Sequence, residues 1–241
     1  MRKQQSAFTL AEVLITLGII GVVAAMTLPT LIQNHKKQTY VVGLQKAMNT
    51  TSNMFKKMQA DEGVDFYNTK LFSEGICEWG YGWDDNSQQI ININGCEDFY
   101  GNISIFENII PKYLKVVKTC KGDAECNIKY TATYLSKQNN KYVLTNSSPN
   151  RNAAQIFGSF ITGTLANFKV IGFYTNDGMV YYIFPKWNGI GVLVDINGEK
   201  GPNTLNRDLF IYFYNSNGLI DSSENSSGTE YLMSNGWKMD Y

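Results

Sequence analysis

FTLAEVLITLGIIGVVAAMTLP, residues 8–29, is the stretch that decides the fold, because every side chain in it except that of Glu12 is apolar, small or a threonine. Up to the proline it would form a helix of about 31 Å, close to the hydrocarbon thickness of a bilayer. The leader before it, residues 1–7, is short and polar and carries Arg2 and Lys3. Basic residues ahead of an apolar span favour a cytoplasmic N-terminus. The stretch therefore predicts one membrane-spanning helix, with the bulk of the chain on the far side.

Glu12 is the charged side chain within this apolar run, and a carboxylate inside a spanning helix costs free energy. A cut between Ala7 and Phe8 would create a new ammonium group on Phe8. That ammonium would lie one helical turn from Glu12, at the positive end of the helix dipole. Processing at this position would therefore give the carboxylate a partner, in the same subunit or in a neighbouring one.

A basic leader, a small residue, Phe-Thr-Leu-x-Glu, about twenty apolar residues and a proline together closely resemble the N-terminus of type IV pilin-like proteins. That group holds type IV pilins, type II secretion pseudopilins and competence pilins. The resemblance implies cleavage by a prepilin peptidase between Ala7 and Phe8, and N-methylation of Phe8. It also implies that Glu12 is the assembly glutamate and that Pro29 kinks the helix. The residue before the cut is usually Gly in that family, whereas here it is Ala7.

The same resemblance implies where the protein works and with what. It predicts a bacterial inner-membrane precursor with a cytoplasmic N-terminus, and a globular domain that is periplasmic or extracellular in a filament. The implied partners are copies of the chain, other pilin-like subunits, the prepilin peptidase, an assembly platform and the inner membrane. The implied role is that of a structural subunit, a pilin or pseudopilin of a type IV pilus, type II secretion or competence filament, and not that of an enzyme.

Three other interpretations remain open from the residues alone. An ordinary secretory signal could be cut after Ala25, at a small-x-small site. A plain single-pass anchor is the second. The third is a monomeric membrane-anchored binding domain that recognises a sugar or protein, because Trp79, Tyr81 and Trp83 alternate with glycines and would form one aromatic face of a strand. Filament formation separates the pilin-like interpretation from a monomeric anchor.

Beyond Pro29 the apolar residues recur at three- and four-residue spacing, which predicts an amphipathic helix that continues to about residue 59. The apolar positions, with one threonine, are Tyr40, Val41, Leu44, Ala47, Met48, Thr51, Met54, Phe55 and Met58. Gly63 follows near the predicted end. The predicted division is a leader at 1–7, a transmembrane or filament-core helix at 8–32, its amphipathic continuation at 33–59 and a globular α+β domain at 60–241.

The C-terminal part has the pattern of an antiparallel meander. Alternating and apolar runs separated by turn residues predict strands at 169–175, 179–184, 190–195 and 209–214. Shorter strands are predicted at 89–93 and 141–144, and a short helix that begins near Pro111 and ends near Thr119. The fold class is therefore α+β, with a long N-terminal helix, apolar in its first half, packed on a C-terminal antiparallel β-sheet. The pilin family has the same architecture.

The four cysteines are an even number, and the chain has a single histidine, His35. Zinc sites use histidines or closely spaced cysteine pairs, and neither pattern is present. On the far side of a membrane disulfides persist. Local pairing predicts two disulfides, Cys77 with Cys96 and Cys120 with Cys126, among three possible connectivities.

The segment from Asp195 to Asp208 lies between two predicted strands and is rich in oxygen ligands of the kind that calcium takes. It lacks the EF-hand pattern but is similar to a loop of pseudopilin-like sequences, and the major secretion pseudopilins hold a calcium in a C-terminal loop. Lys200 and Arg207 within the segment argue against a cation. A plain turn is the preferred interpretation, and no metal or other cofactor is expected.

Charge and composition exclude several further functions. With 21 basic and 21 acidic residues the chain is not a polycation. Lys112, Lys115, Lys118 and Lys121 recur every three residues, but on a helix they would spread over half the circumference, so a solvated face is expected and nucleic-acid binding is not. With one imidazole and no spacing of acids that implies shared chemistry, the sequence indicates no enzyme.

Overall fold

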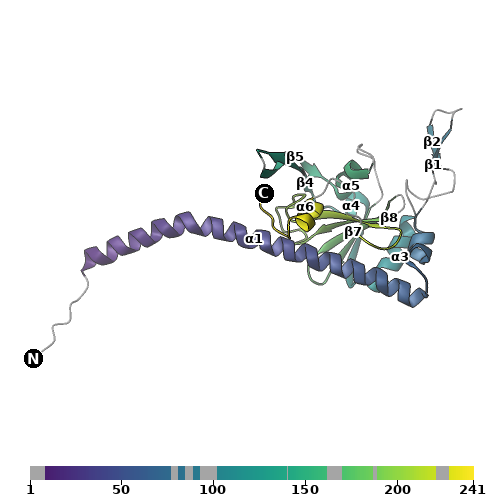
Figure 1. The fold of residues 1–241 in the computed structure, drawn as a ribbon, viewed down its shortest axis with the longest axis horizontal. Helices are drawn as coiled ribbons and strands as arrows, with labels where there is room; N and C mark the ends of the chain where they lie inside the picture. Colours follow the sequence, from purple (N-terminus) through teal and green to yellow (C-terminus); the bar gives the residue numbers. More distant parts are fainter. Residues whose placement is uncertain are drawn as a thin grey trace, which may run out of the picture. The chain divides into compact units, whose positions relative to one another are not determined.

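The computed structural model describes residues 9–76, 81–84, 89–92, 102–139, 141–161, 170–186, 189–220 and 228–241. A long N-terminal helix is followed by antiparallel sheets, which confirms the predicted α+β class (Figure 1). Contacts divide the chain into two compact units, residues 1–39 and residues 40–241. The division falls inside the long helix, at the residue where side chains begin to be buried.

Helix α1 extends from Leu10 to Glu62. Its buried positions lie within the second unit and are Tyr40, Val41, Gly43, Leu44, Ala47, Met48, Thr51, Met54, Phe55 and Met58. This set contains all nine positions that the periodicity predicted. Gly63, at φ +66°, ends the helix, and the N–H of Val64 donates to the Gln59 carbonyl in the usual glycine-terminated cap.

The main sheet has five antiparallel strands in the order β3-β6-β7-β8-β9. Their bounds are Val116–Lys121, Ile171–Thr175, Val180–Lys186, Gly189–Asp195 and Leu209–Asn215. The last four correspond to the predicted meander.

The fifth strand, β3, corrects the prediction of a helix that ends near Thr119. Helix α3 is instead Ile103–Tyr113, so Pro111 lies in its last turn and not in its first. The next residues extend and pair with β6, with Thr119 opposite Phe173 and Cys120 opposite Gly172. Pairing with the edge of a formed sheet outweighs the helical spacing of Ile110, Tyr113, Leu114 and Val117.

The remaining described elements are short or flank the sheet. They are η1 Phe66–Asn68, α2 Lys70–Ser73, β1 Tyr81–Asp84, β2 Gln89–Asn92, α4 Gly122–Glu125, β4 Tyr130–Gln138, β5 Lys141–Arg151, α5 Ala153–Ile161 and α6 Gly228–Ser234. Strands β1 and β2 form one antiparallel pair, and β4 and β5 form another.

Both faces of the main sheet are covered, whereas the sequence predicted one covered face. The second half of α1 packs on one face, where Leu44 and Phe55 belong to a cluster with Val192 and Tyr212. The other face packs against β4 and α5, in a second cluster around Phe157. This second layer explains why β8 is buried along its whole length instead of alternating.

Candidate functional site

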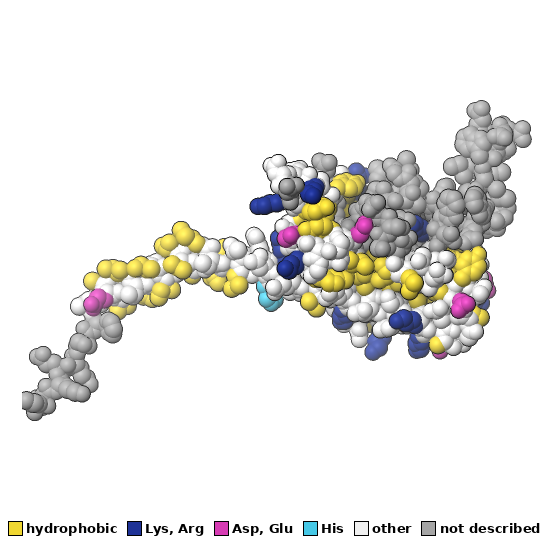
Figure 2. Space-filling view, viewed as in Figure 1, with side chains coloured by type: hydrophobic (Ala, Val, Ile, Leu, Met, Phe, Trp, Pro, Cys, Tyr) yellow, Lys and Arg dark blue, Asp and Glu magenta, His cyan; other side chains and the backbone are white. Residues whose placement is uncertain are grey.

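The first half of α1 exposes its apolar side chains on every side of the helix. Large apolar residues here are between 42% and 79% exposed. Figure 2 shows hydrophobic side chains along this part of the helix. They are Leu10, Val13, Leu14, Ile15, Leu17, Ile19, Ile20, Val22, Val23, Met26, Leu28, Leu31 and Ile32. By length and composition, α1 is the helix among the described residues that is able to cross a membrane. A helix that is apolar all round requires lipid or other helices around it.

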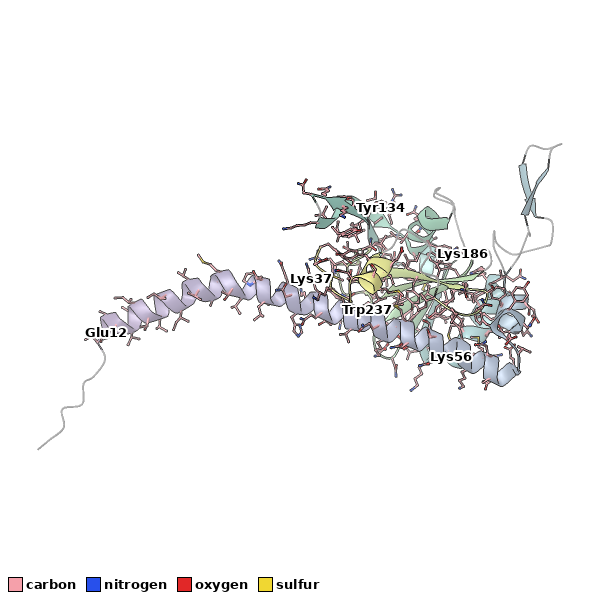
Figure 3. All side chains as sticks on the ribbon, viewed as in Figure 1. Glu12, Lys37, Lys56, Tyr134, Lys186 and Trp237 are labelled. Carbon is pink, nitrogen blue, oxygen red and sulfur yellow. A yellow bond between two sulfur atoms is a disulfide. The ribbon has the colours of Figure 1, made fainter. Side chains whose placement is uncertain are left out.

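Glu12 lies at the N-terminal end of the described helix (Figure 3) and forms a capping box with Thr9. The backbone N–H and the hydroxyl of Thr9 each donate to Glu12 Oε2 at 2.8 Å, and the backbone N–H of Glu12 donates back to Thr9 Oγ1 at 3.3 Å. The pair satisfies donors that the first turn of a helix would otherwise leave free. In the unprocessed chain, the carboxylate is therefore held at the start of α1.

Thr9 contacts Glu12 in this site, and the sequence interpretation did not assign it. Its signal was present, because a threonine followed three residues later by a glutamate at the start of an apolar run is the pattern of a capping box. Ala7 and Phe8, which flank the predicted cut, lie outside the described residues. Helix α1 runs through Pro29 without ending there, and the kink at Pro29 stays a prediction.

Residues 2–28 match the family model of the prokaryotic N-terminal methylation motif. The chain carries a prepilin-type N-terminus. This motif fits a type IV pilin-like or pseudopilin-like protein, and it implies processing by a prepilin peptidase, assembly with other pilins and anchoring of the precursor in the inner membrane. No curated protein and no solved structure matches the chain.

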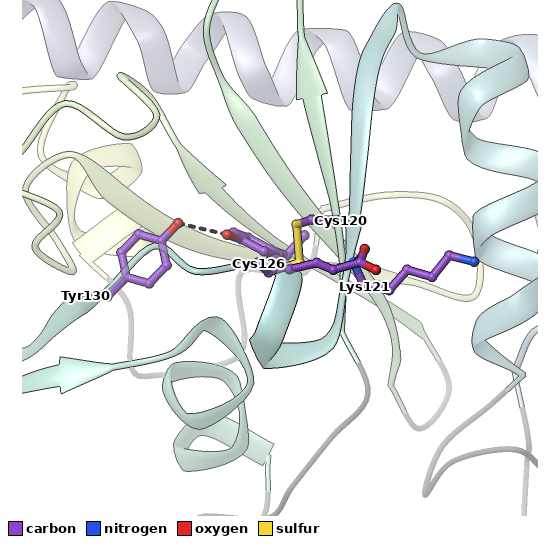
Figure 4. Close-up of a disulfide and its surroundings, with 6 residues drawn as sticks. Cys120, Lys121, Cys126 and Tyr130 are labelled. Atoms are coloured by element: carbon purple, nitrogen blue, oxygen red, sulfur yellow. Dashed lines mark hydrogen bonds between the residues drawn. A yellow bond between two sulfur atoms is a disulfide. The ribbon is translucent and has the colours of Figure 1, made fainter.

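The matched segment ends before the globular domain of this prepilin-type chain. The features of that domain are therefore described from the structure alone. Cys120 and Cys126 are joined by a disulfide with an S–S distance of 2.10 Å (Figure 4). Both are buried, and Lys121 beside them contacts Glu107 of α3 at 2.6 Å. The bond ties the end of edge strand β3 to the chain that leads into β4. Cys77 and Cys96, the other predicted pair, lie outside the described residues, as does Trp79.

The loop from Asp195 to Asp208 joins β8 to β9 and holds two fully buried carboxylates. The two oxygens of Asp208 accept the backbone N–H groups of Thr204 at 2.7 Å and Asn203 at 2.8 Å. Asp195 Oδ1 accepts the N–H of Asn197 at 3.2 Å. Burial and repulsion from Asp208 raise the pKa of the Asp195 carboxyl to about 8. The loop therefore places two carboxyl groups where burial and mutual repulsion disfavour the charged form of Asp195.

Three oxygens of this loop are buried and have no hydrogen-bond partner: Asp195 Oδ2, Asn197 Oδ1 and Asn203 Oδ1. Lys200 and Arg207, which counted against a cation in the sequence, form no ion pair with either carboxylate in the described structure. The described residues contain no group of three or more His, Cys, Asp or Glu side chains able to hold a metal, so amide oxygens would have to complete a site. Two carboxylates with two amide oxygens are a donor set that suits a hard cation such as Ca²⁺.

The four lysines considered for nucleic acid are separated by the fold. Lys112 lies in the last turn of α3, and Lys115 follows that helix. Lys118 and Lys121 belong to β3, where Lys118 Nζ lies 5.1 Å from the ring centroid of Tyr174 and Lys121 pairs with Glu107. The four lysines do not lie along one helix, so they do not form the single helical face that their three-residue spacing suggested.

Proposed function

We propose that this chain is the precursor of a structural subunit of a type IV pilin-like filament, a pilin or pseudopilin. The observation that supports the proposal is the arrangement at the start of α1. A carboxylate held by Thr9 lies at the start of a helix whose first half exposes its large apolar side chains. An apolar surface of this size is unfavourable in water. A membrane would cover it in the precursor, and a bundle of similar helices would cover it after assembly.

The capping box gives this proposal an order of events. Before processing, Glu12 accepts hydrogen bonds from Thr9 within its own chain. Cleavage between Ala7 and Phe8 would free an ammonium on Phe8, which methylation leaves charged. In the assembled filament, the Glu12 carboxylate would face the Phe8 ammonium of a neighbouring copy, and the apolar helices would surround the pair. The carboxylate thus changes from a local cap to an intersubunit contact.

The globular domain, in this proposal, stays outside the cytoplasm and forms the surface of the filament. Residues 40–62 of α1 are already packed on the domain's own sheet, so they attach the filament core to that surface. The partners proposed are further copies of the chain, other pilin-like subunits, the prepilin peptidase and the assembly platform. The role is structural and not catalytic.

The loop from Asp195 to Asp208 is proposed to hold a calcium-type cation, which revises the expectation of no cofactor. Asp195, Asp208, Asn197 and Asn203 would be its ligands, because their buried oxygens include three that nothing else satisfies. A bound cation supplies the positive charge that the loop lacks. The Asp208 side chain itself holds the loop at Asn203 and Thr204 against the start of β9 through their backbone N–H groups.

The position of the mature N-terminus tests the filament proposal directly. Full-length protein produced together with a prepilin peptidase should start at N-methylated Phe8, as determined by intact mass and N-terminal sequencing. Protein produced without the peptidase should keep residues 1–7. Ala7→Gly, which restores the residue usual before the cut, should be processed at least as completely. A mature terminus at Met26 would show an ordinary signal peptide and overturn the proposal.

A further inference from the structure

A cavity of about 590 Å³ opens within the globular domain, apart from both the exposed first half of α1 and the Asp195–Asp208 loop. Its walls are the second half of α1, the end of α3 with the residues that follow it, and the turn that joins β6 to β7. This volume is in the range of sites for small molecules. We call it the lysine pocket, after the three lysines among the residues that line it: Lys46, Lys57 and Lys115.

The charges of the lysine pocket do not balance. Lys46 Nζ is paired with Asp177 Oδ2 at 2.7 Å, at the turn between β6 and β7. Lys57 and Lys115 are exposed, and neither makes an ion pair with another described residue. Asp177 is the acid among the lining residues and pairs with Lys46. Asp61 and Glu62 act on Tyr113 from outside the lining, and neither forms an ion pair with Lys57 or Lys115, whose ammonium groups therefore have no ion-pair partner in the described walls. An anionic group is the ligand that would complete them.

The remaining walls of the pocket suit a hydroxylated ring more than a bare anion. The ring of Tyr113 is partly buried and stands beside Lys57, whose Nζ lies 5.8 Å from the ring centroid. Burial, together with the charges of Asp61 and Glu62, raises the pKa of Tyr113, so its hydroxyl remains a neutral group. Asn53 of α1 and Asn176 of the turn between β6 and β7 both line the pocket and are exposed. An aromatic face beside amide groups contacts the C–H face of a sugar while hydrogen-bonding its hydroxyls.

From these features we infer that the lysine pocket binds an acidic saccharide of one or two sugar rings, with a uronate carboxylate against Lys57 and Lys115. One ring face lies on Tyr113, and the hydroxyls reach Asn53 and Asn176. An acidic peptide is the less suitable occupant, because the strand residues among the described lining, Thr175 and Tyr181, belong to β6 and β7, which are already paired on both sides within the sheet. The inference does not depend on filament assembly.

Calorimetric titration of the full chain, in a detergent without a sugar headgroup, tests the inference. Digalacturonic acid should bind, and its affinity should fall as salt is added, since the contacts of Lys57 and Lys115 are exposed to solvent. Cellobiose, a neutral disaccharide of similar size, should bind at least tenfold more weakly. Triglutamate should also bind at least tenfold more weakly than digalacturonic acid. Equal affinity for cellobiose, tighter binding of triglutamate, or no binding of digalacturonic acid would each overturn the inference.

Matched lysine substitutions locate the binding. Lys57→Gln and Lys115→Gln should each weaken the binding of digalacturonic acid about tenfold, the usual size of one charge-assisted hydrogen bond. Lys56→Gln, on the same helix (Figure 3), and Lys112→Gln, on α3, change the same charge outside the pocket and should leave affinity unchanged. Thermal unfolding of each variant shows that it remains folded. If the control substitutions weaken binding as much as those in the pocket, the saccharide is held by overall charge and the site is excluded.

Discussion

Within helix α1, residues 10–39 contain no buried side chain, whereas residues 40–62 bury ten residues against the domain. Both halves have the same secondary structure, and both are rich in apolar residues. They differ in where the apolar residues stand: all round the helix in the first half, and on one face in the second. The second half has its partner within the chain, the sheet with Val192 and Tyr212. The first half needs a partner from outside.

The comparison shows how one helix can belong to two surroundings. Exposed polar and charged side chains such as Asn49 and Lys56 cover the open face of the second half, so that half needs no further partner in water. In the first half, Glu12 carries the charge within the apolar run, and it stands at the helix terminus where a capping partner or a new ammonium can meet it. The position of a single carboxylate therefore carries the distinction between an anchor and an assembling subunit.

Replacing that carboxylate is the change with the largest expected effect. Glu12→Leu should insert into membranes as well as wild type does, since it removes a charge from hydrocarbon, but it should not assemble, because the Phe8 ammonium of a neighbour would be left unpaired. Shearing of cells, followed by comparison of filament-bound and membrane-bound protein, measures both properties. Glu12→Gln keeps the size of the side chain without its charge and should also fail to assemble.

If Glu12→Leu assembled as wild type does, the proposed filament contact would lose its support. A monomeric anchored binding domain would then be the better description of the chain.

The next largest effect is on the free energy of unfolding, which should respond differently to a leucine substitution in each half of α1. Leu44 is fully buried in the second half, so Leu44→Ala should lower the free energy of unfolding of the domain by about 3 kcal/mol or more, through lost burial and a residual cavity. Leu17 is 61% exposed in the first half, and Leu17→Ala should change this free energy by less than about 0.5 kcal/mol. Urea unfolding of the full chain in detergent, followed by tryptophan fluorescence, measures both. Similar losses for the two variants would contradict the comparison.

Sequence periodicity predicted the second half of α1 well because burial there depends on one face of one helix. It missed Gly43, which has no apolar side chain but is buried where Ile196 lies against the helix. Strands β6 to β9 were also predicted, since each is an apolar run ended by turn residues. The edge strand β3 was not, because its residues suit either structure and only the neighbouring β6 decides between them.

The second layer and the burial of the loop from Asp195 to Asp208 could not be predicted, because both depend on distant contacts. Strand β4 is covered only because it meets the far face of the sheet, where Tyr130 and Tyr182 share a hydrogen bond of 3.0 Å (Figure 4). The loop is buried partly through β4, since the N–H of Thr131 donates to the Asn203 carbonyl. Nothing in the local sequence shows that Asp195 loses its water. The sequence therefore showed the oxygen-bearing side chains of the loop but not their burial.

The third prediction concerns the cation proposed for the loop from Asp195 to Asp208, which lies outside both halves of α1. Calcium at 100 times its dissociation constant should add about 2.7 kcal/mol to the free energy of unfolding of chelator-treated protein, a rise of several degrees in Tm. Asp195→Asn and Asp208→Asn should abolish the rise. Glu199→Gln, an exposed acid of the same loop, should retain it. A rise of equal size in all variants would place the cation elsewhere.

In the absence of a bound cation, we also expect the stability of the domain to depend on pH through Asp195. The folded chain raises the pKa of Asp195 to about 8, so the folded state binds this proton more readily than the unfolded state does. Stability contributed by the protonated group is complete below about pH 4 and is lost as the pH rises toward 8. Thermal unfolding in chelator across this range should show the loss for wild type, and a flatter profile for Asp195→Asn.

The smallest expected effect concerns hydrogen bonds instead of apolar packing, and it compares one threonine in each half of α1. Thr51 is fully buried, and its hydroxyl lies 2.7 Å from the hydroxyl of Tyr214 and 3.2 Å from that of Tyr212 on β9. Burial raises the pKa of both tyrosines, so they remain hydroxyl groups that need partners at ordinary pH. Thr51→Val keeps the shape of the side chain but removes that partner, and should cost about 1–2 kcal/mol of the free energy of unfolding.

Thr16 supplies the matched control for Thr51, because its hydroxyl bonds only to the Val13 carbonyl, 2.9 Å away on its own exposed helix. Thr16→Val should leave the domain's free energy of unfolding unchanged. Adding Tyr212→Phe to Thr51→Val removes the hydroxyl that the first change left without this partner, so the double variant should lose less than the sum of the two single losses. Additive losses would show that the threonine acts only within α1, and that the helix is held on the sheet by apolar packing alone.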